Sequence, residues 1–561
     1  MLTPLCILSA VCRPVACPWQ RPELEDHIVI ERKIETEAYW RDELSITDQD
    51  MEELSFLFLE TERPLTVSEL AQSLVASYCQ WEDDLVRRQL SVGTVYRPNG
   101  SFSVGEKLAF PHLGFALGTV VEQRDGHNRE HGDFRVITVQ LANEEREKTR
   151  SFAAEFKVPH KLALSQGSSW ESVFALAPDD LYRRYGSVVT ARLKERLLAT
   201  SEFEGFRGWW LPSDMLADLH VGYLNIAEAM LDVKGEPLLP EELLVELELP
   251  DEISQPIKVF SLNRALSHDD RFDDVGDDQR VLWSLQRWEP EVVLSPPARL
   301  RYEPVVYDRT GLDVAHLQLE REIDDEASEL VASPTIANAR SLTLLLGYSH
   351  WRTGALPLTA RTRVFFPSGN PEQHTLITFV DRLNHKEFPG WVVRGHRFVH
   401  GLEDWYSSYH IPVGAYVRLE RLESSRRVAI SYVPRRMQRE WVRVVSTNAD
   451  GELTFQMQKR PIACEYDEMC LLGEGGREVA DELWQREQER NRSLDELVSA
   501  VFLELAKVSP NGMVHSKTLN NAVNVIRRCP PGLLFAALFR LPQFVTTGDG
   551  YWVFQPSGRV Y

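Results

Sequence analysis

The spacing of apolar residues between 258 and 290 constrains the fold of this chain more than any other feature of its sequence. A helical run through Phe260, Leu262 and Leu266 leads into an acidic, turn-rich stretch. The alternating residues 282–288, which follow, have the spacing of a strand. Gly276 and the two aspartates after it are typical of a tight turn between strands. The segment therefore predicts a helix that runs into a β-hairpin.

Several residues of this hairpin suggest a family. Asp270-Arg271-Phe272, the turn residue Gly276, Trp283-Ser-Leu285 and Trp288-Glu-Pro290 together resemble the end of the HARE-HTH domain, a winged-helix domain of the RNA polymerase delta subunit and its relatives. The resemblance covers about residues 222–290, and residues 491–561 resemble a winged helix more weakly. It implies a domain that works beside a polymerase, or another complex subunit, and binds protein. The candidate protein-binding residues are Arg271, Phe272, Trp283 and Trp288.

The same pattern of helix, turn and helix occurs three times. Residues 46–90 contain the capping box Thr66-Val-Ser-Glu69 ahead of an apolar helical run, and Ser493-Leu-Asp-Glu496 is a second such box. In the last copy, an apolar helix over 533–539 is followed by alternating residues up to 554, which again predicts a hairpin. We expect three divergent helix-turn-helix units, at 46–90, 222–292 and 493–561.

The segments between these units alternate like strands. Four strand-like runs punctuated by glycines predict a small SH3-like β-barrel over 91–165, and the pattern over 166–221 predicts a helical connector. A β-rich pseudo-barrel or sandwich is expected over 293–470, and a polar helical linker over 471–492, whereas 1–45 is poorly defined. The strands expected in the large block are 342–346, 362–366, 376–380, 391–393, 415–419 and 428–433. The fold class is α+β multidomain, with winged helix-turn-helix units alternating with β-barrel-like modules.

Composition limits the partners. The net charge of −22 opposes binding of nucleic acid over the whole surface, but the charge is uneven. Residues 232–290 carry 15 acidic and 6 basic residues, whereas 507–561 carry 6 basic residues and one acidic residue. The seven cysteines form no CxxC pair, and the apolar start 1–17 has no basic residue ahead of its apolar run. We expect a cytoplasmic protein without a membrane span or a cofactor.

The C-terminal unit carries the first group of candidate nucleic-acid contacts. A winged helix that reads DNA places its third helix in the major groove, with basic side chains near phosphates. The helix expected after Pro530-Pro531 carries Arg540 and Gln543, with Arg527 and Arg528 just before it. Its strongly apolar sequence also fits packing against protein. The candidates are Lys517, Arg527, Arg528, Arg540 and Gln543.

The second group lies in the β block. Residues 382–443 contain 12 basic and 6 acidic residues interleaved with aromatic ones, a combination that suits phosphates and unstacked bases. The alternative is that the aromatic residues fill the core while the arginines lie on a solvated face. The candidates are Arg394, Arg397, Arg435, Arg436 and Arg439.

Signs of catalysis are weak. His127-Asn-Arg-Glu130-His131 matches an inverted zinc-protease motif, but it lies between glycines in a strand-rich stretch, so we expect a polar hairpin loop and no metal. Cys464 and Cys470 fit no zinc ribbon, and Asp324, Asp325 and Glu326 fit no nuclease motif. We expect a non-enzymatic regulatory protein that binds DNA or RNA. The alternatives are a protein scaffold without nucleic-acid contact or a nuclease or modification subunit.

Overall fold

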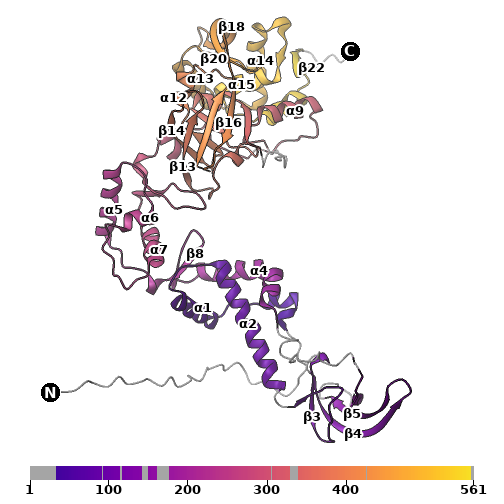
Figure 1. Cartoon of the computed structure of the whole chain (residues 1–561). Helices are drawn as coiled ribbons and strands as arrows, with labels where there is room; N and C mark the ends of the chain where they lie inside the picture. The colour runs from indigo at the N-terminus through magenta and orange to yellow at the C-terminus, as the bar shows by residue number, and fades with distance from the viewer. Residues whose placement is uncertain are drawn as a thin grey trace, which may run out of the picture. The chain divides into compact units, whose positions relative to one another are not determined.

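The computed structural model shows a mixed α+β chain with several separate sheets (Figure 1). It describes residues 33–90, 93–113, 116–141, 149–158, 160, 176–304, 306–328, 339–424 and 426–556. The expectations for the apolar start 1–17 and its three cysteines lie outside this part of the chain. Two compact units are present: Met1–Leu216 with Ser254–Phe260, and Ala217–Ile253 with Ser261–Tyr561.

The helices and hairpin of the first unit come from both sides of an insertion. The unit consists of the short turns η1 (Lys33–Glu35) and η2 (Tyr39–Glu43), the helices α1 (Asp48–Thr61), α2 (Val67–Leu90) and α4 (Pro178–Leu198), and the strands β1 (Leu65–Thr66), β7 (Phe203–Phe206) and β8 (Trp209–Pro212). β1 pairs with β8, so the sheet order is β1-β8-β7. The expected helical connector therefore supplies a third helix and a hairpin to the unit that begins at α1.

The insertion is a five-stranded sheet in the order β2-β3-β4-β5-β6. Its strands are β2 (Thr94–Val95), β3 (Lys107–Phe110), β4 (Ala116–Asn128), β5 (Gly132–Leu141) and β6 (Thr149–Ala154). It has a core of its own, built around Tyr96, Phe110 and Ile137. The stretch 127–131 contains the last two residues of β4 and the turn that joins β4 to β5, which forms the expected hairpin.

This arrangement predicts which fragment of the first unit folds. Phe58 and Leu65 are buried, and their partners include Phe203, with ring centroids 5.9 Å apart, and Trp210, which pairs with Leu65. A fragment of residues 33–216 should show a cooperative thermal transition by circular dichroism, because it keeps these partners. A fragment of residues 33–165, which lacks α4, β7 and β8 but keeps the inserted sheet, should show no cooperative loss of its helical signal at 222 nm. A cooperative loss of the helical signal in the shorter fragment would contradict this assignment.

The middle segment has the same chain order as the first unit without its insertion. Helices α5 (Val221–Lys234), α6 (Pro240–Leu244) and α7 (Gln255–Leu266) are followed by strands β9 (Phe272–Asp274) and β10 (Trp283–Leu285). β10 lies between β9 and an isolated bridge at Leu238. Gly276 sits in the hairpin where a Cβ would approach the Arg280 carbonyl oxygen to 2.0 Å, so only glycine fits. The expected helix and hairpin are confirmed.

The tip of this hairpin docks on the large sheet. Val275 is buried in an apolar cluster with Val293, Trp391 and Phe398. Its carbonyl oxygen accepts a hydrogen bond of 3.0 Å from the Leu376 amide. The docked tip is thus covered by the sheet and is not a free wing.

The large β block is a seven-stranded sheet in the order β11-β16-β17-β13-β14-β15-β12 (Figure 1). Its strands are β11 (Ser341–Leu345), β12 (Ala355–Pro357), β13 (His374–Asp381), β14 (Glu387–Val393), β15 (Phe398–His400), β16 (Tyr416–Arg421) and β17 (Arg427–Tyr432). β13 and β17 are parallel and the other neighbours are antiparallel. Short helices α8 (Glu291–Leu294), α11 (Tyr348–Arg352) and α12 (Glu403–Ser408) flank it.

One expected strand of this block is absent. Residues 363–365 form the 3₁₀ turn η6 (Arg363–Phe365) in place of the strand expected over 362–366. The Thr362 hydroxyl donates a hydrogen bond of 2.7 Å to the Pro357 carbonyl oxygen, and it accepts one of 2.8 Å from the Thr359 amide. These side-chain bonds favour a turn over a strand.

The C-terminal segment repeats the same order of elements once more. It contains α14 (Leu494–Lys507), η7 (Pro510–Gly512), β21 (Val514–His515), α15 (Ser516–Ile526), α16 (Pro531–Arg540), β22 (Phe544–Gly548) and β23 (Tyr551–Phe554), with sheet order β21-β23-β22. Strands β18 (Pro434–Thr447), β19 (Leu453–Cys464) and β20 (Leu472–Glu474) form a further sheet. The stretch expected as a polar linker contains α13 (Arg477–Arg490), whose Ala480 and Leu483 are buried in the core of this segment.

Candidate nucleic-acid interface

The hairpin of β18 and β19 is half core and half surface. Near its turn, Val445 lies opposite Phe455, and both side chains are buried. Beyond Val442 the two strands stay paired, but most of their side chains are exposed. We call this outer half, residues 434–443 and 456–461, the basic ribbon.

The basic ribbon concentrates positive charge next to exposed apolar groups. It contains six basic residues and one acidic residue, Glu440. Trp441 is 57% exposed and Met437 is 67% exposed, which is unusual for such large apolar side chains. The Lys459 Nζ lies 5.0 Å from the centre of the Trp441 ring, on the strand position directly opposite. An exposed indole flanked by cations can stack on a base while the cations contact phosphates.

The cations of the ribbon differ in how far they are committed to internal partners. Arg435 pairs with Glu440 at 2.6 Å, and its guanidinium lies 5.4 Å from the Tyr466 ring centre. Arg460 donates a hydrogen bond of 2.7 Å to the Glu474 carbonyl oxygen. Arg436 and Arg439 are exposed and form no ion pair within the described part of the chain. These two and Lys459 are therefore the cations best placed to meet a phosphate.

The other two candidates of the β block, Arg394 and Arg397, make contacts within the protein, although Arg397 is exposed. Arg394 donates hydrogen bonds to the Thr375 hydroxyl at 2.8 Å and to the Pro367 carbonyl oxygen at 2.5 Å, and burial lowers its pKa. The Arg397 guanidinium lies 3.9 Å from the centre of the Tyr302 ring. The structure thus brings Arg435, Arg436 and Arg439 together and leaves Arg394 and Arg397 outside the ribbon.

In the C-terminal segment, Lys517 is buried and forms two ion pairs. Its Nζ lies 2.6 Å from a Glu322 carboxylate oxygen and 2.7 Å from one of Asp467. Burial lowers the pKa of Lys517, but the two carboxylates raise it by more, so the pKa lies above its usual value. Its positive charge is neutralised inside the protein, so Lys517 does not face a phosphate in this structure.

Arg528 also forms its ion pairs within the protein. It pairs with Asp325 at 2.8 Å and with Glu326 at 2.6 Å, and both carboxylates are buried. The His350 Nε2 lies 3.0 Å from the other oxygen of Glu326. Burial raises the pKa of Glu326, but His350 and Arg528 hold it well below its usual range. Arg527 pairs with the buried Glu487 at 2.8 Å.

The third helix of the C-terminal segment is covered. Helix α9 (Val314–Ile323) packs against α16, and its His316 ring lies 5.3 Å from Phe535 and 4.9 Å from Phe539. A Cβ at Gly532 would lie 2.1 Å from the Tyr307 hydroxyl. The expected insertion of this helix into a major groove is therefore blocked in this structure. Arg540 pairs with Asp495, and the Gln543 amide lies 3.5 Å from the Ser499 hydroxyl.

Two substitutions compare how much an internally paired arginine, Arg528, and an exposed arginine, Arg436, contribute to stability. Arg528→Ala should lower the free energy of unfolding by about 3–5 kcal/mol, because it leaves Asp325 and Glu326 buried without their cation. Arg436→Ala, on the ribbon surface, should change it by no more than about 0.5 kcal/mol. Urea unfolding of both variants measures the difference. Equal stability of the two would contradict the structural role of Arg528.

The expected protein-binding residues of the middle segment are mostly internal. Phe272 and Trp283 are buried, and the Trp283 indole donates a hydrogen bond of 2.8 Å to Asn263. Arg271 pairs with Glu228 at 2.5 Å and with Asp269 at 2.6 Å, and Trp288 is half-buried.

Helix α5 of this segment, by contrast, carries exposed apolar side chains. Ile226 is 42% exposed and Val233 is 86% exposed. They lie seven residues apart, so they share one face of the helix. This face can be recognised in the sequence, because α5 has apolar residues at helical spacing in addition to the buried Ala227 and Leu231.

The acidic residues considered for a nuclease are paired. Asp325 and Glu326 contact Arg528, and Asp324 lies 3.3 Å from Arg361. Burial raises the pKa of Asp324 to about 6. Cys464 and Cys470 are buried thiols, and burial raises the pKa of Cys464 to about 11.

Comparisons with protein-family models, with curated proteins and with solved structures find no match to this chain. Among the described helices, no single one is long and apolar enough to cross a bilayer. Only α15 and α16 taken together meet that test, and they are bent by 112°.

Proposed function

We propose that this is a non-enzymatic, nucleic-acid-associated regulatory protein whose basic ribbon contacts DNA or RNA. The observation that carries the proposal is the exposed Trp441 with the cations of Arg436, Arg439 and Lys459 on the same hairpin. A two-stranded ribbon is narrow enough to enter a groove, and its exposed indole also suits an unpaired base. The net charge of −22 disfavours phosphate binding over the surface as a whole, so binding would depend on a local concentration of cations such as this one.

We also propose that the three units with helices and a hairpin are winged helices. Two of them share the order helix, strand, helix, helix, strand, strand, with the first strand paired to the last. In the middle unit, the bridge between Leu238 and Trp283 takes the place of the first strand pair. This order supports the resemblance of residues 222–290 to the HARE-HTH domain.

The winged helices serve protein contacts in this proposal. The third helix of the C-terminal unit is covered by α9, so that unit supports the ribbon and does not read bases. The middle unit is acidic and exposes Ile226 and Val233 on α5, which suits a protein partner such as a polymerase or another complex subunit.

Binding of the full chain to labelled single-stranded and double-stranded DNA and RNA tests the ribbon. The variant Arg436→Ala/Arg439→Ala/Lys459→Ala should bind at least tenfold more weakly at low salt. The slope of log affinity against log salt should fall by about two to three, because each lost phosphate contact no longer releases a counterion. Trp441→Ala should weaken binding to single strands more than to duplexes, since only unpaired bases stack on the ring.

A matched control removes three cations from another surface. Arg183, Arg184 and Lys194 are exposed on α4, so Arg183→Ala/Arg184→Ala/Lys194→Ala changes the net charge equally and should leave affinity within about twofold. Equal losses in both triple variants would show non-specific attraction and would refute the ribbon assignment. Absence of binding by the unmodified chain at low salt would favour the alternative, a protein scaffold without nucleic-acid contact.

A further inference from the structure

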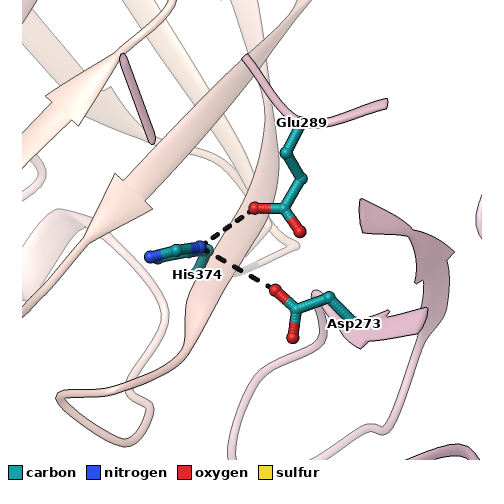
Figure 2. Close-up of side chains that lie close together, drawn as sticks. All are labelled: Asp273, Glu289 and His374. Atoms are coloured by element: carbon teal, nitrogen blue, oxygen red, sulfur yellow. Dashed lines mark hydrogen bonds and ion pairs between the residues drawn. The ribbon is translucent and has the colours of Figure 1, made fainter. Parts of the chain in front are cut away.

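Three side chains from separate segments meet where the middle hairpin docks on the large sheet. Asp273 lies on β9, Glu289 follows the 3₁₀ turn η5 (Gln286–Trp288), and His374 begins β13. Their side chains point toward one another (Figure 2). The His374 Nδ1 lies 2.9 Å from a Glu289 oxygen and 3.8 Å from an Asp273 oxygen. One potential ligand atom from each residue lies within 4.8 Å of the others.

These distances suit a metal ion between the three groups. Zinc binds imidazole nitrogen and carboxylate oxygen at about 2.0–2.2 Å, which places neighbouring ligand atoms about 3–4 Å apart. Imidazole and carboxylate are also the ligand types that divalent transition metals accept. The observed separations therefore need little adjustment.

Glu289 supplies a second, independent observation. Its side chain is fully buried, and its Oε1 finds no hydrogen-bond partner among the described residues, although its Oε2 contacts His374. A buried carboxylate oxygen without a partner is costly, and a bound cation is one way to satisfy it. Within the described part of the chain, no lysine or arginine pairs with Glu289 or Asp273.

The charge of the cluster also calls for a cation. Two carboxylates face a single imidazole, so with both carboxylates ionised the group stays negative even when His374 is protonated. A divalent ion would neutralise this charge.

We propose that Asp273, Glu289 and His374 form a binding site for one divalent transition-metal ion, with Zn²⁺ as its simplest occupant. Three protein ligands leave at least one coordination position for water. The half-exposed side chains of Asp273 and His374 place that position toward solvent. The ion would link the hairpin, the turn that follows it and the start of β13, and so connect the middle unit to the large sheet.

The test uses the untagged full chain, stripped with chelator and titrated with Zn²⁺ by calorimetry. We expect one ion per chain at micromolar affinity or tighter, and a rise in the thermal midpoint on loading. His374→Gln and Glu289→Gln should each weaken binding at least tenfold. Glu289→Gln removes the charge but keeps the shape of the side chain, so its unloaded form should unfold at or above the temperature of the unmodified protein.

The control is His385→Asn, which removes an exposed histidine in the turn after β13, at a backbone φ of 60° that asparagine tolerates. It should bind Zn²⁺ as the unmodified chain does. The proposal fails if the stripped protein binds no Zn²⁺ at tens of micromolar. It fails equally if a bound ion persists with unchanged affinity in both His374→Gln and Glu289→Gln, since the ion would then lie elsewhere.

Discussion

The buried ion pairs of Arg528 with Asp325 and Glu326 are the interaction on which the arrangement of the second unit depends. They join the end of α15 to the loop after α9, and His350 of α11 completes the group. Each carboxylate would be costly to bury alone, so the loop, the helix and the sheet edge must all be in place together. Lys517 makes a similar connection to Glu322 and Asp467. The basic residues Lys517 and Arg528 of this segment therefore hold its parts together through internal ion pairs and are not available to an external partner.

The sequence predicted the type of most elements because local spacing decides them. The hairpin over 272–285, five of the six expected strands of the large block and the loop at 127–131 all follow from alternation and turn residues. The strand expected over 362–366 failed because the hydroxyls of Thr359 and Thr362 bond to nearby backbone and form a turn. Polar residues of this kind compete with regular structure in a way that spacing alone does not reveal.

Local spacing could not predict contacts between residues that lie far apart in the sequence. A count of charges cannot tell that Lys517 is buried and that the Arg528 side chain is only 13% exposed, while Arg436 and Arg439 are exposed. Burial depends on which distant segment packs on each residue. The candidate metal ligands Asp273, Glu289 and His374 are likewise separated in the chain and have no motif spacing. The sequence could indicate the ribbon because Arg435, Arg436, Arg439 and Trp441 lie within seven consecutive residues.

The insertion between α2 and α4 has a consequence for how the first unit is made. Leu65 of β1 must wait for Trp210 of β8, which emerges from the ribosome 145 residues later. The five-stranded sheet, with its own core, can close on itself in the meantime. Bringing two such distant strands together costs more loop-closure entropy when the intervening segment is unfolded than when it is already compact. The inserted sheet thus shortens the effective loop, and its folding should precede and accelerate closure of the domain that encloses it.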